Sequence, residues 1–278
     1  MTKAVSKLPV KPGAVLGILK ELRESAQAEK PLVVSGAREL VAVLVRELTR
    51  GGVATAVREQ GPIEGAAALV HVLAGPLDKD DEQVLKEAAR ARVPIVVVTT
   101  GSGSPGHIAY VLDQNVVRVG AATALPVEEI ATRLARALGE AGTPLAARLP
   151  VLRRPVCEEL IRKLSRQNGL VGVAGFKPGA DLPVLTLNQI RLMLRIADAY
   201  GFEIDRERLP EVIGVIGSGF GFRALARRGV ELVPIVGWVL KGAVAYAGTR
   251  ALGEAAMRYF ERRAPVTRVA GARTLFPR

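Results

Sequence analysis

Two turns in this sequence carry amides and hydroxyls that could bind a small anion. Both turns follow apolar runs. The weak candidate residues are Ser35, Gly36, Thr100, Gly101 and Ser102. Backbone amides and hydroxyls at the carboxyl ends of strands can bind an anion. The simpler alternatives are a helix N-cap at Ser35 and a flexible Gly/Ser connection over TTGSGSPGH (99–107), and we favour them.

Other chemically active side chains are few. His71 lies inside the apolar stretch 66–75, and we expect a core histidine with one hydrogen bond, because no Cys, Asp or second His is placed to join it. The single Cys157 excludes an intramolecular disulfide framework, and two histidines are too few for a histidine-rich metal site. We therefore expect no catalytic residue, no cofactor and no metal.

Short apolar strands alternate with amphipathic helices over residues 1–142. This alternation is typical of a three-layer α/β sandwich with a mostly parallel sheet. The expected strands cover residues 32–34, 53–59, 66–75, 93–101 and 116–120. The expected helices cover residues 13–28, 78–91 and 126–140, with a further helix between an N-cap at Ser35 and a stop at Gly51 and Gly52.

The order of these elements resembles a small GTPase domain from which the nucleotide-binding motifs are missing. In that family GxxxxGK[ST] follows the first strand, and its amides and lysine hold the phosphates. Here the matching turn is VSGAREL (34–40), and the base-reading Asn-Lys-x-Asp is replaced by TTGS (99–102). The Asp-x-x-Gly motif is missing before AAALVHVLAG. The resemblance therefore implies a P-loop-less, GTPase-like domain that does not hydrolyse GTP.

The second part of the chain is expected to be all helical. Three prolines in residues 141–156 predict a linker, placed at 143–155, between an α/β domain (1–142) and a helical domain (156–263) with a basic tail (264–278). A helix over 156–169 should end at Asn168 and Gly169. The next helix has an apolar stripe from Leu187 to Tyr200. Its expected polar face carries Asn188, Arg191, Arg195 and Asp198.

Positive charge is concentrated in this second part. Of 39 Lys and Arg and 27 Asp and Glu residues, 18 and 16 lie in residues 1–150, so residues 151–278 carry 21 and 11, a net charge of +10. The apolar run 230–249 is interrupted by Lys241, which favours a shallow hairpin hinged at 234–237 or a buried helix pair over a spanning helix. The expected membrane or partner surface is Arg227, Arg228, Trp238, Lys241, Arg250 and Arg258.

Three stretches carry a second resemblance. They are RQNGLVGVAGFKPGADLPVLTLNQIRLMLRIADAYG, ERLPEVIG and VPIVGWVLKGAVAYAGTRALGEAAMRYF. Together they resemble the YcjF-type domain of unknown function, over most of residues 150–262. That domain follows bacterial GTP-binding domains and occurs in some inner-membrane proteins. The resemblance implies an all-helical, membrane-associated domain with no established catalytic residues.

These patterns favour a non-enzymatic, membrane-associated or assembly protein, a pseudo-GTPase platform that carries a basic helical domain. The alternative is a nucleotide- or phosphate-sensing regulator with residual ligand binding in the α/β domain. The expected partners are an anionic membrane surface or another protein, with homo-oligomerisation as a further option. Nucleic acid is disfavoured because the basic residues lack interleaved aromatic side chains.

No secretory signal opens the sequence, so we expect a cytoplasmic protein at the inner face of the membrane. Whether residues 211–257 insert in lipid stays open.

Overall fold

A computed structural model of the chain describes residues 10–101, 106–120, 125–174, 182–203, 237–264 and 273–274. The chain divides into two compact units. The α/β unit comprises Gln27–Val156 and Pro265–Gly271. The helical unit comprises Met1–Ala26, Cys157–Ala264 and Ala272–Arg278. Residues 234–236 of the predicted hinge and most of the predicted basic tail lie outside the described residues, as do Arg227 and Arg228, whereas Gly237 begins a helix.

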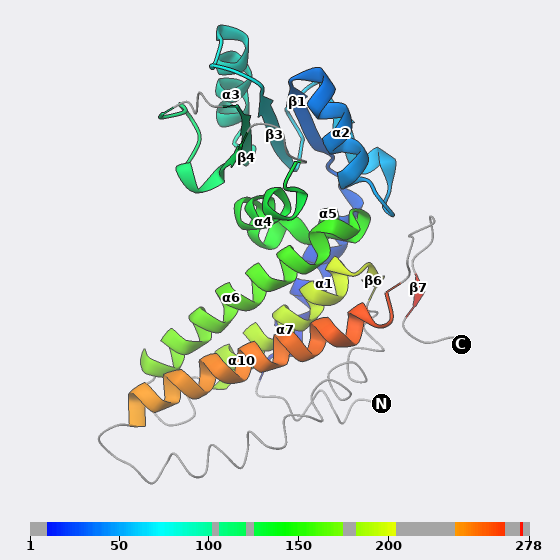
Figure 1. Cartoon of the computed structure of the whole chain (residues 1–278). Coiled ribbons are helices and arrows are strands. Elements are labelled where there is room, and N and C mark those ends of the chain that lie inside the picture. Colours follow the sequence, from blue (N-terminus) through cyan, green and yellow to red (C-terminus); the bar gives the residue numbers. More distant parts are fainter. Residues whose placement is uncertain are drawn as a thin grey trace. The chain divides into compact units, whose positions relative to one another are not determined.

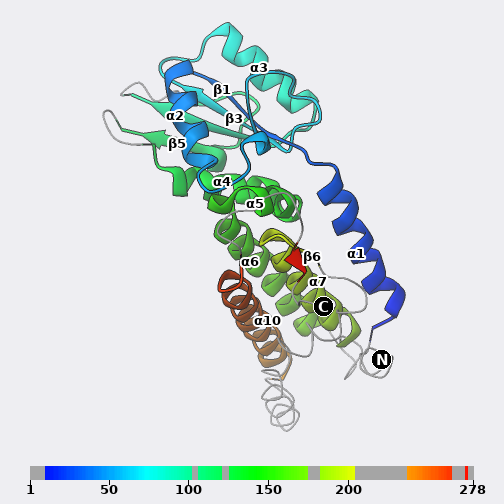
Figure 2. The same cartoon turned by 90° about the vertical axis from the view of Figure 1, so that its right-hand side faces the viewer.

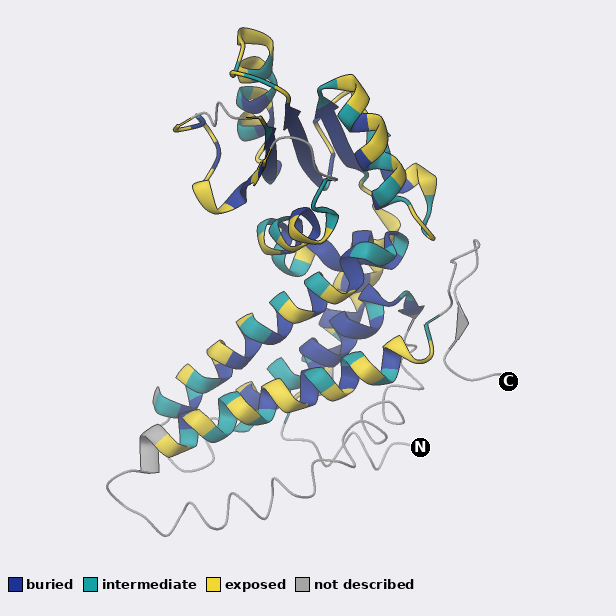
Figure 3. Ribbon diagram, viewed as in Figure 1, coloured by how far each residue is buried: buried dark blue, intermediate teal, exposed yellow. Residues whose placement is uncertain are grey.

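A five-stranded parallel sheet forms the centre of the α/β unit (Figure 1). Its strands are β1 Leu32–Gly36, β2 Val57–Glu59, β3 Ala68–Leu73, β4 Ile95–Thr100 and β5 Val116–Val119. Their order, β2-β1-β3-β4-β5, is one of the two common orders of doubly wound sheets. All six residues of β3 are buried, and Figure 3 shows the strands in the buried colour. The sheet confirms the α/β prediction, because runs of Val, Leu and Ile buried on both faces are typical of parallel strands.

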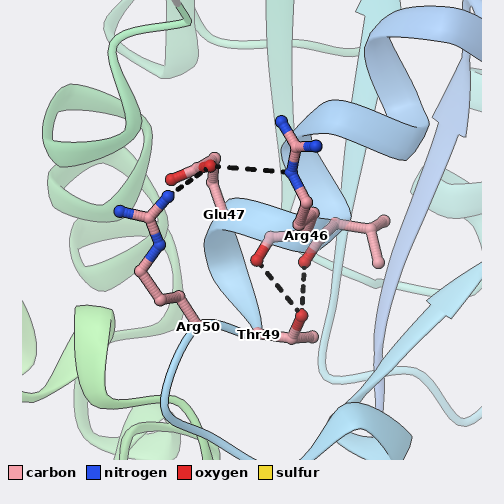
Figure 4. A network of polar contacts seen from close by, with 5 residues as sticks. Arg46, Glu47, Thr49 and Arg50 are labelled. Atoms are coloured by element: carbon pink, nitrogen blue, oxygen red, sulfur yellow. Dashed lines mark hydrogen bonds and ion pairs between the residues drawn. The ribbon is translucent and has the colours of Figure 1, made fainter.

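Helices α2 Arg38–Leu48, α3 Lys79–Arg90 and α4 Val127–Leu138 follow strands β1, β3 and β5. Helix α3 begins with a reciprocal capping box between Asp78 and Asp81, which satisfies two backbone amides. At the end of α2, the Thr49 hydroxyl donates to the Val45 carbonyl at 2.8 Å (Figure 4). Helix α2 ends at Leu48, before the predicted glycine stop, and Gly51 lies in the turn beyond it with φ +68°.

Residues 143–155, predicted as a linker, are almost entirely helical. They belong to α5 Thr143–Arg148 and to the start of α6 Pro150–Ala174. Leu145, Leu149 and Leu152 are each at most 1% exposed. The prolines misled the prediction because Pro144 and Pro150 stand in the first turns of helices, where an amide proton has no helical partner.

The helical unit contains α1 Pro12–Gln27, most of α6, α7 Leu182–Ala199 and α10 Gly237–Glu261 (Figure 2). It also holds the short parallel pair β6 Phe202–Glu203 and β7 Arg273–Thr274. Helix α1 was expected with the α/β domain, but it groups with the helical unit. It buries Val15, Ile18, Leu19 and Leu22, the stripe of an amphipathic helix.

The prediction that α7 has a polar face opposite its apolar stripe is wrong. Arg195 is only 4% exposed, and its guanidinium donates to Glu21 of α1 at 2.6 Å. Arg191 also lies 3.7 Å from the same carboxylate. The apolar stripe was correctly identified, with Ile190, Met193 and Leu194 buried. Helix α7 is covered on more than one side, so its arginines are paired inside the unit.

Helices α6 and α10 approach closely through glycine. A Cβ added at Gly242 of α10 would lie 2.4 Å from Val173 Cγ2 and 2.9 Å from the Gly169 carbonyl oxygen, both of α6. Helix α6 runs to Ala174, past Asn168 and Gly169, so the predicted helix end at these residues is wrong. Glycine at position 169 serves helix contact here, as small residues do where two backbones must approach.

A buried polar network joins three helices of this unit. Asn168 of α6 donates to the Thr249 hydroxyl of α10 at 2.8 Å, and Asn188 of α7 donates to Asn168 Oδ1 at 2.7 Å. Thr249 in turn donates to the Ala245 carbonyl. Asn168 and Thr249 are fully buried. Since a buried amide without partners is costly, these contacts favour one register of the three helices.

Within the described residues, no helix has the length and apolar character needed to cross a membrane.

Candidate functional site at the carboxyl edge of the sheet

The carboxyl ends of β1 and β3 mark the point where the sheet changes direction. From β1 the chain passes through α2 to β2 on one side, and from β3 it passes through α3 to β4 on the other. Right-handed crossovers in opposite directions place the two helices on opposite faces of the sheet. Ligands of doubly wound proteins bind at this switch point, outside the carboxyl ends of the strands.

Ser35, His71 and Asp81 form one hydrogen-bonded chain at this point. Ser35 of β1 and His71 of β3 are register partners, and Ser35 Oγ lies 2.7 Å from His71 Nδ1. His71 Nε2 lies 2.7 Å from Asp81 Oδ1, in the first turn of α3. The His71 side chain is 2% exposed, and that of Asp81 is 21% exposed. The chain of contacts joins two strands to the helix that follows them.

The Asp81 carboxylate has two structural partners. While Oδ1 contacts His71, Oδ2 accepts from the Asp78 amide at 3.3 Å, closing the capping box of α3. A carboxylate beside Nε2 favours the tautomer that carries its proton there, which leaves Nδ1 to accept from the Ser35 hydroxyl. The start of α3 is thereby fixed to the buried centre of the sheet.

The prediction that His71 has a single hydrogen-bond partner is wrong, and so is the prediction of Ser35 as an N-cap. The residue in the N-cap position of α2 is Ala37, which supplies no side-chain hydrogen bond. Ser35 instead belongs to β1. The sequence did contain the missing partner, since the acidic run DKDDE follows the His71 strand. A helix that starts beside the carboxyl end of its strand brings its first turn close to that edge.

The turn after β1 is closed by contacts with β3. The Ala37 amide donates to the Val72 carbonyl oxygen at 2.9 Å. Gly36 has φ +105°, and a Cβ at this position would lie 2.0 Å from the same oxygen. Position 36 therefore requires glycine for both backbone angle and space. The Ala37 amide, which a phosphate bound at this turn would need as a donor, already donates to Val72.

The second predicted turn lies on the other side of β3. Thr100, the last residue of β4, donates from its hydroxyl to the Leu73 carbonyl at 3.3 Å, and Gly101 follows with φ +106°. Ser102 lies outside the described residues. The two candidate turns are therefore separated by β3, and each makes a hydrogen bond to a carbonyl at its carboxyl end.

The Ser35–His71–Asp81 order has the components of a nucleophilic relay. In serine hydrolases an imidazole takes the hydroxyl proton and a carboxylate holds the imidazole. Here the hydroxyl faces Nδ1 and the carboxylate faces Nε2, the reverse of the order in chymotrypsin-type triads. Ser35 is only 9% exposed, which leaves little access for a carbonyl substrate. The arrangement suits a structural clamp better than acyl transfer.

The predicted basic surface is partly described. Arg250 and Arg258 of α10 are exposed, and both lie near Glu254, at 2.9 Å and 3.7 Å. The hydrogen bond to Glu254 raises the pKa of the Arg250 guanidinium, which keeps its charge. Lys241 is half-buried. Trp238 belongs to α10, although its side chain is not among those described.

Across the described residues, no group of three or more His, Cys, Asp or Glu side chains could hold a metal ion. Comparison of the chain with family models, curated proteins and solved structures gives no match. The resemblances to GTPase-like and YcjF-type domains therefore stay predictions.

Proposed function

We propose that this chain is a non-enzymatic assembly protein of the cytoplasmic membrane face, in which a pseudo-GTPase α/β platform carries a basic helical unit that binds anionic membrane. The closed turn after β1 is the observation that carries the proposal. A GTPase needs a long loop of free amides at this position. Here one residue, Ala37, separates β1 from α2, and its amide is bonded to Val72.

Side-chain burial supports the same conclusion. The three polar groups at the switch point are hydrogen-bonded to one another, and His71 is almost fully buried. A ligand that used Ser35 or His71 would have to break these bonds, and each broken buried bond costs about 1–3 kcal/mol. The α/β unit is thus better suited to support a neighbouring surface than to bind a nucleotide.

The helical unit supplies the binding surface in this proposal. Arg250 and Arg258 are exposed on α10, and Glu254 balances only one of their two charges. Arg263, near the end of the same helix, stacks 3.9 Å from the Tyr259 ring centroid. A basic segment gains about 1 kcal/mol per Lys or Arg near an anionic membrane surface.

Co-sedimentation with lipid vesicles tests the proposal. The full chain should pellet with vesicles that contain phosphatidylglycerol, and less with pure phosphatidylcholine vesicles. Added salt should release it, because exposed charges are screened. The double variant Arg250→Glu and Arg258→Glu should bind at least about 30-fold more weakly, since each reversal removes about 1 kcal/mol or more.

The α/β unit offers a matched control. Arg46 and Arg50 also share one carboxylate, that of Glu47, at 3.8 Å and 2.7 Å (Figure 4). The variant Arg46→Glu and Arg50→Glu makes the same change in net charge and should bind as the parent chain does. Equal losses in the two double variants would show that only total charge matters. No binding to anionic vesicles would reject the membrane part of the proposal.

A further inference from the structure

A pocket of about 420 Å³ lies at the amino edge of the sheet, opposite to the edge that carries Ser35. It is formed where β4 and β5 begin, because Ile95 starts β4 and Asn115 directly precedes β5. The segments after α3 and at the end of α4 complete it with Arg92 and Arg136. The volume falls within the usual range for small-molecule sites.

Two residues of this pocket have a backbone conformation that favours glycine. Arg92 has φ +55° and Tyr110 has φ +69°. Arg92 follows α3 in a Schellman motif, in which its amide donates to the Ala89 carbonyl and the Val93 amide donates to Ala88. Glycine is the usual residue at this position, and another residue costs about 1 kcal/mol. Strained positions of this kind cluster at binding sites.

Four side chains around the pocket are exposed and are available to contact a ligand. Tyr110 is 50% exposed and Leu112 is 64% exposed, and both are large enough to cover an apolar ligand. Both residues are exposed, and neither the Arg92 nor the Arg136 guanidinium forms a hydrogen bond or an ion pair with another described residue. Since no Asp or Glu lines the pocket, its charge is positive.

We propose that this pocket binds a carboxylate that carries an apolar body. The guanidinium groups of Arg92 and Arg136 would attract the carboxylate, and the exposed faces of Tyr110 and Leu112 would cover the apolar part. The carboxyl ends of α3 and α4 also meet at this edge, and helix carboxyl ends carry partial negative charge. These partial charges offset part of the positive charge of the two arginines.

A titration followed by amide NMR of the full chain tests the site. The probes are 4-phenylbutyrate and its neutral amide. The carboxylate should shift the amides of residues 92, 93 and 95 and of residues 108–116. The neutral amide should bind at least about tenfold more weakly, as expected for loss of a charge-assisted contact. Equal binding of the carboxylate and its amide would overturn the proposal, and so would shifts confined to other residues.

A titration with a peptide distinguishes two possible sources of the carboxylate, a small metabolite and the C-terminus of a protein. Acetyl-Leu-Phe with a free carboxyl group is compared with its C-terminal amide. Tighter binding of this peptide acid than of 4-phenylbutyrate assigns the site to a protein C-terminus, and weaker binding assigns it to a small carboxylate. No shift with any carboxylate up to millimolar concentration would reject the site.

Variants distinguish the ligand role from a merely structural one. Arg92→Gly should weaken 4-phenylbutyrate binding about tenfold while the chain keeps or gains thermal stability, because glycine suits this backbone conformation. Arg136→Gln should weaken binding to a similar extent. The control Arg118→Gln changes an exposed arginine of β5 outside the pocket and should leave binding unchanged. Loss of stability in Arg92→Gly with intact binding would show that this arginine only caps α3, and would contradict the proposal.

Discussion

Ser35 and His71 are register partners on neighbouring parallel strands, and their side chains meet with Oγ and Nδ1 only 2.7 Å apart. Through His71 the contact extends to Asp81, so that the start of α3 is joined to the middle of the sheet. Two hydrogen bonds thus connect β1, β3 and α3 at the edge where doubly wound proteins bind ligands. In this chain the edge is occupied by its own side chains.

Replacement of Asp81 should loosen this part of the α/β unit. Asp81→Ala removes the partner of His71 Nε2 and half of the capping box, and leaves a buried imidazole donor unsatisfied. We expect the opening free energy of α3 and β3, measured by native-state hydrogen exchange, to fall by about 1–3 kcal/mol.

The neighbouring Asp80→Ala serves as the control. Asp80 is exposed and lies in the same helical turn, so its loss removes only a charge near the helix start, about 0.3–1 kcal/mol. If the two variants lower the opening free energy equally, the contact between His71 and Asp81 contributes little to stability. The interpretation of Ser35, His71 and Asp81 as a structural link would then be wrong.

The polar network of the helical unit should be energetically important. Thr249→Ala removes the acceptor of the Asn168 amide and the bond to the Ala245 carbonyl. Because Asn168 is fully buried, we expect the free energy of unfolding in urea, followed by circular dichroism, to fall by about 1–3 kcal/mol.

Thr132→Ala is matched to this change. Thr132 of α4 makes the same hydroxyl bond to the carbonyl four residues earlier, at 2.8 Å, but it is exposed. Its replacement should change stability by less than about 0.5 kcal/mol. A Thr249→Ala effect as small as this one would show that the network is dispensable.

The contact between α6 and α10 predicts opposite outcomes for one substitution at two sites. Gly242→Ala places a Cβ 2.4 Å from Val173 Cγ2 and 2.9 Å from a backbone oxygen, so overpacking of about 1–3 kcal/mol should outweigh the gain in helix propensity. Gly17→Ala in α1 meets no atom within 4 Å and should stabilise by about 0.5–1 kcal/mol. Thermal denaturation measures both, and a stabilised Gly242→Ala chain would refute the close helix approach.

Local patterns placed all five strands of the large sheet and most helices. Residues 54–56 of the predicted strand 53–59 form a 3-10 turn instead, and the pair β6 and β7 was missed, so the prediction of an all-helical second part is wrong at that point. Continuous Val, Leu and Ile runs identified β3 and β4, and the acidic first turn identified the start of α3. The failures involve residues whose role depends on distant contacts. The prolines of 143–155 read as a linker although two of them open helices, and Asn168 read as a helix end although it is held by Thr249, 81 residues away.

The candidate site could be predicted only in part. Ser35, Gly36, Thr100 and Gly101 do lie at the carboxyl edge of the sheet, as the alternating pattern implied, but on β1 and β4, which β3 separates. The link from His71 to Asp81 was missed because it depends on the distance between a strand and the next helix, ten residues on. The pocket with Arg92 and Tyr110 was not predicted either, since left-handed backbone angles at non-glycine residues leave no mark in composition or periodicity.

Magnesium-dependent GTP turnover by the purified full chain is the most direct test of the proposed function. The short, closed turn between β1 and α2 leaves no loop to hold a triphosphate, so calorimetry should show no heat with GTP or GDP and phosphate release should equal the buffer blank. Saturable heat together with magnesium-dependent phosphate release would contradict the proposal that the α/β unit is a non-enzymatic platform.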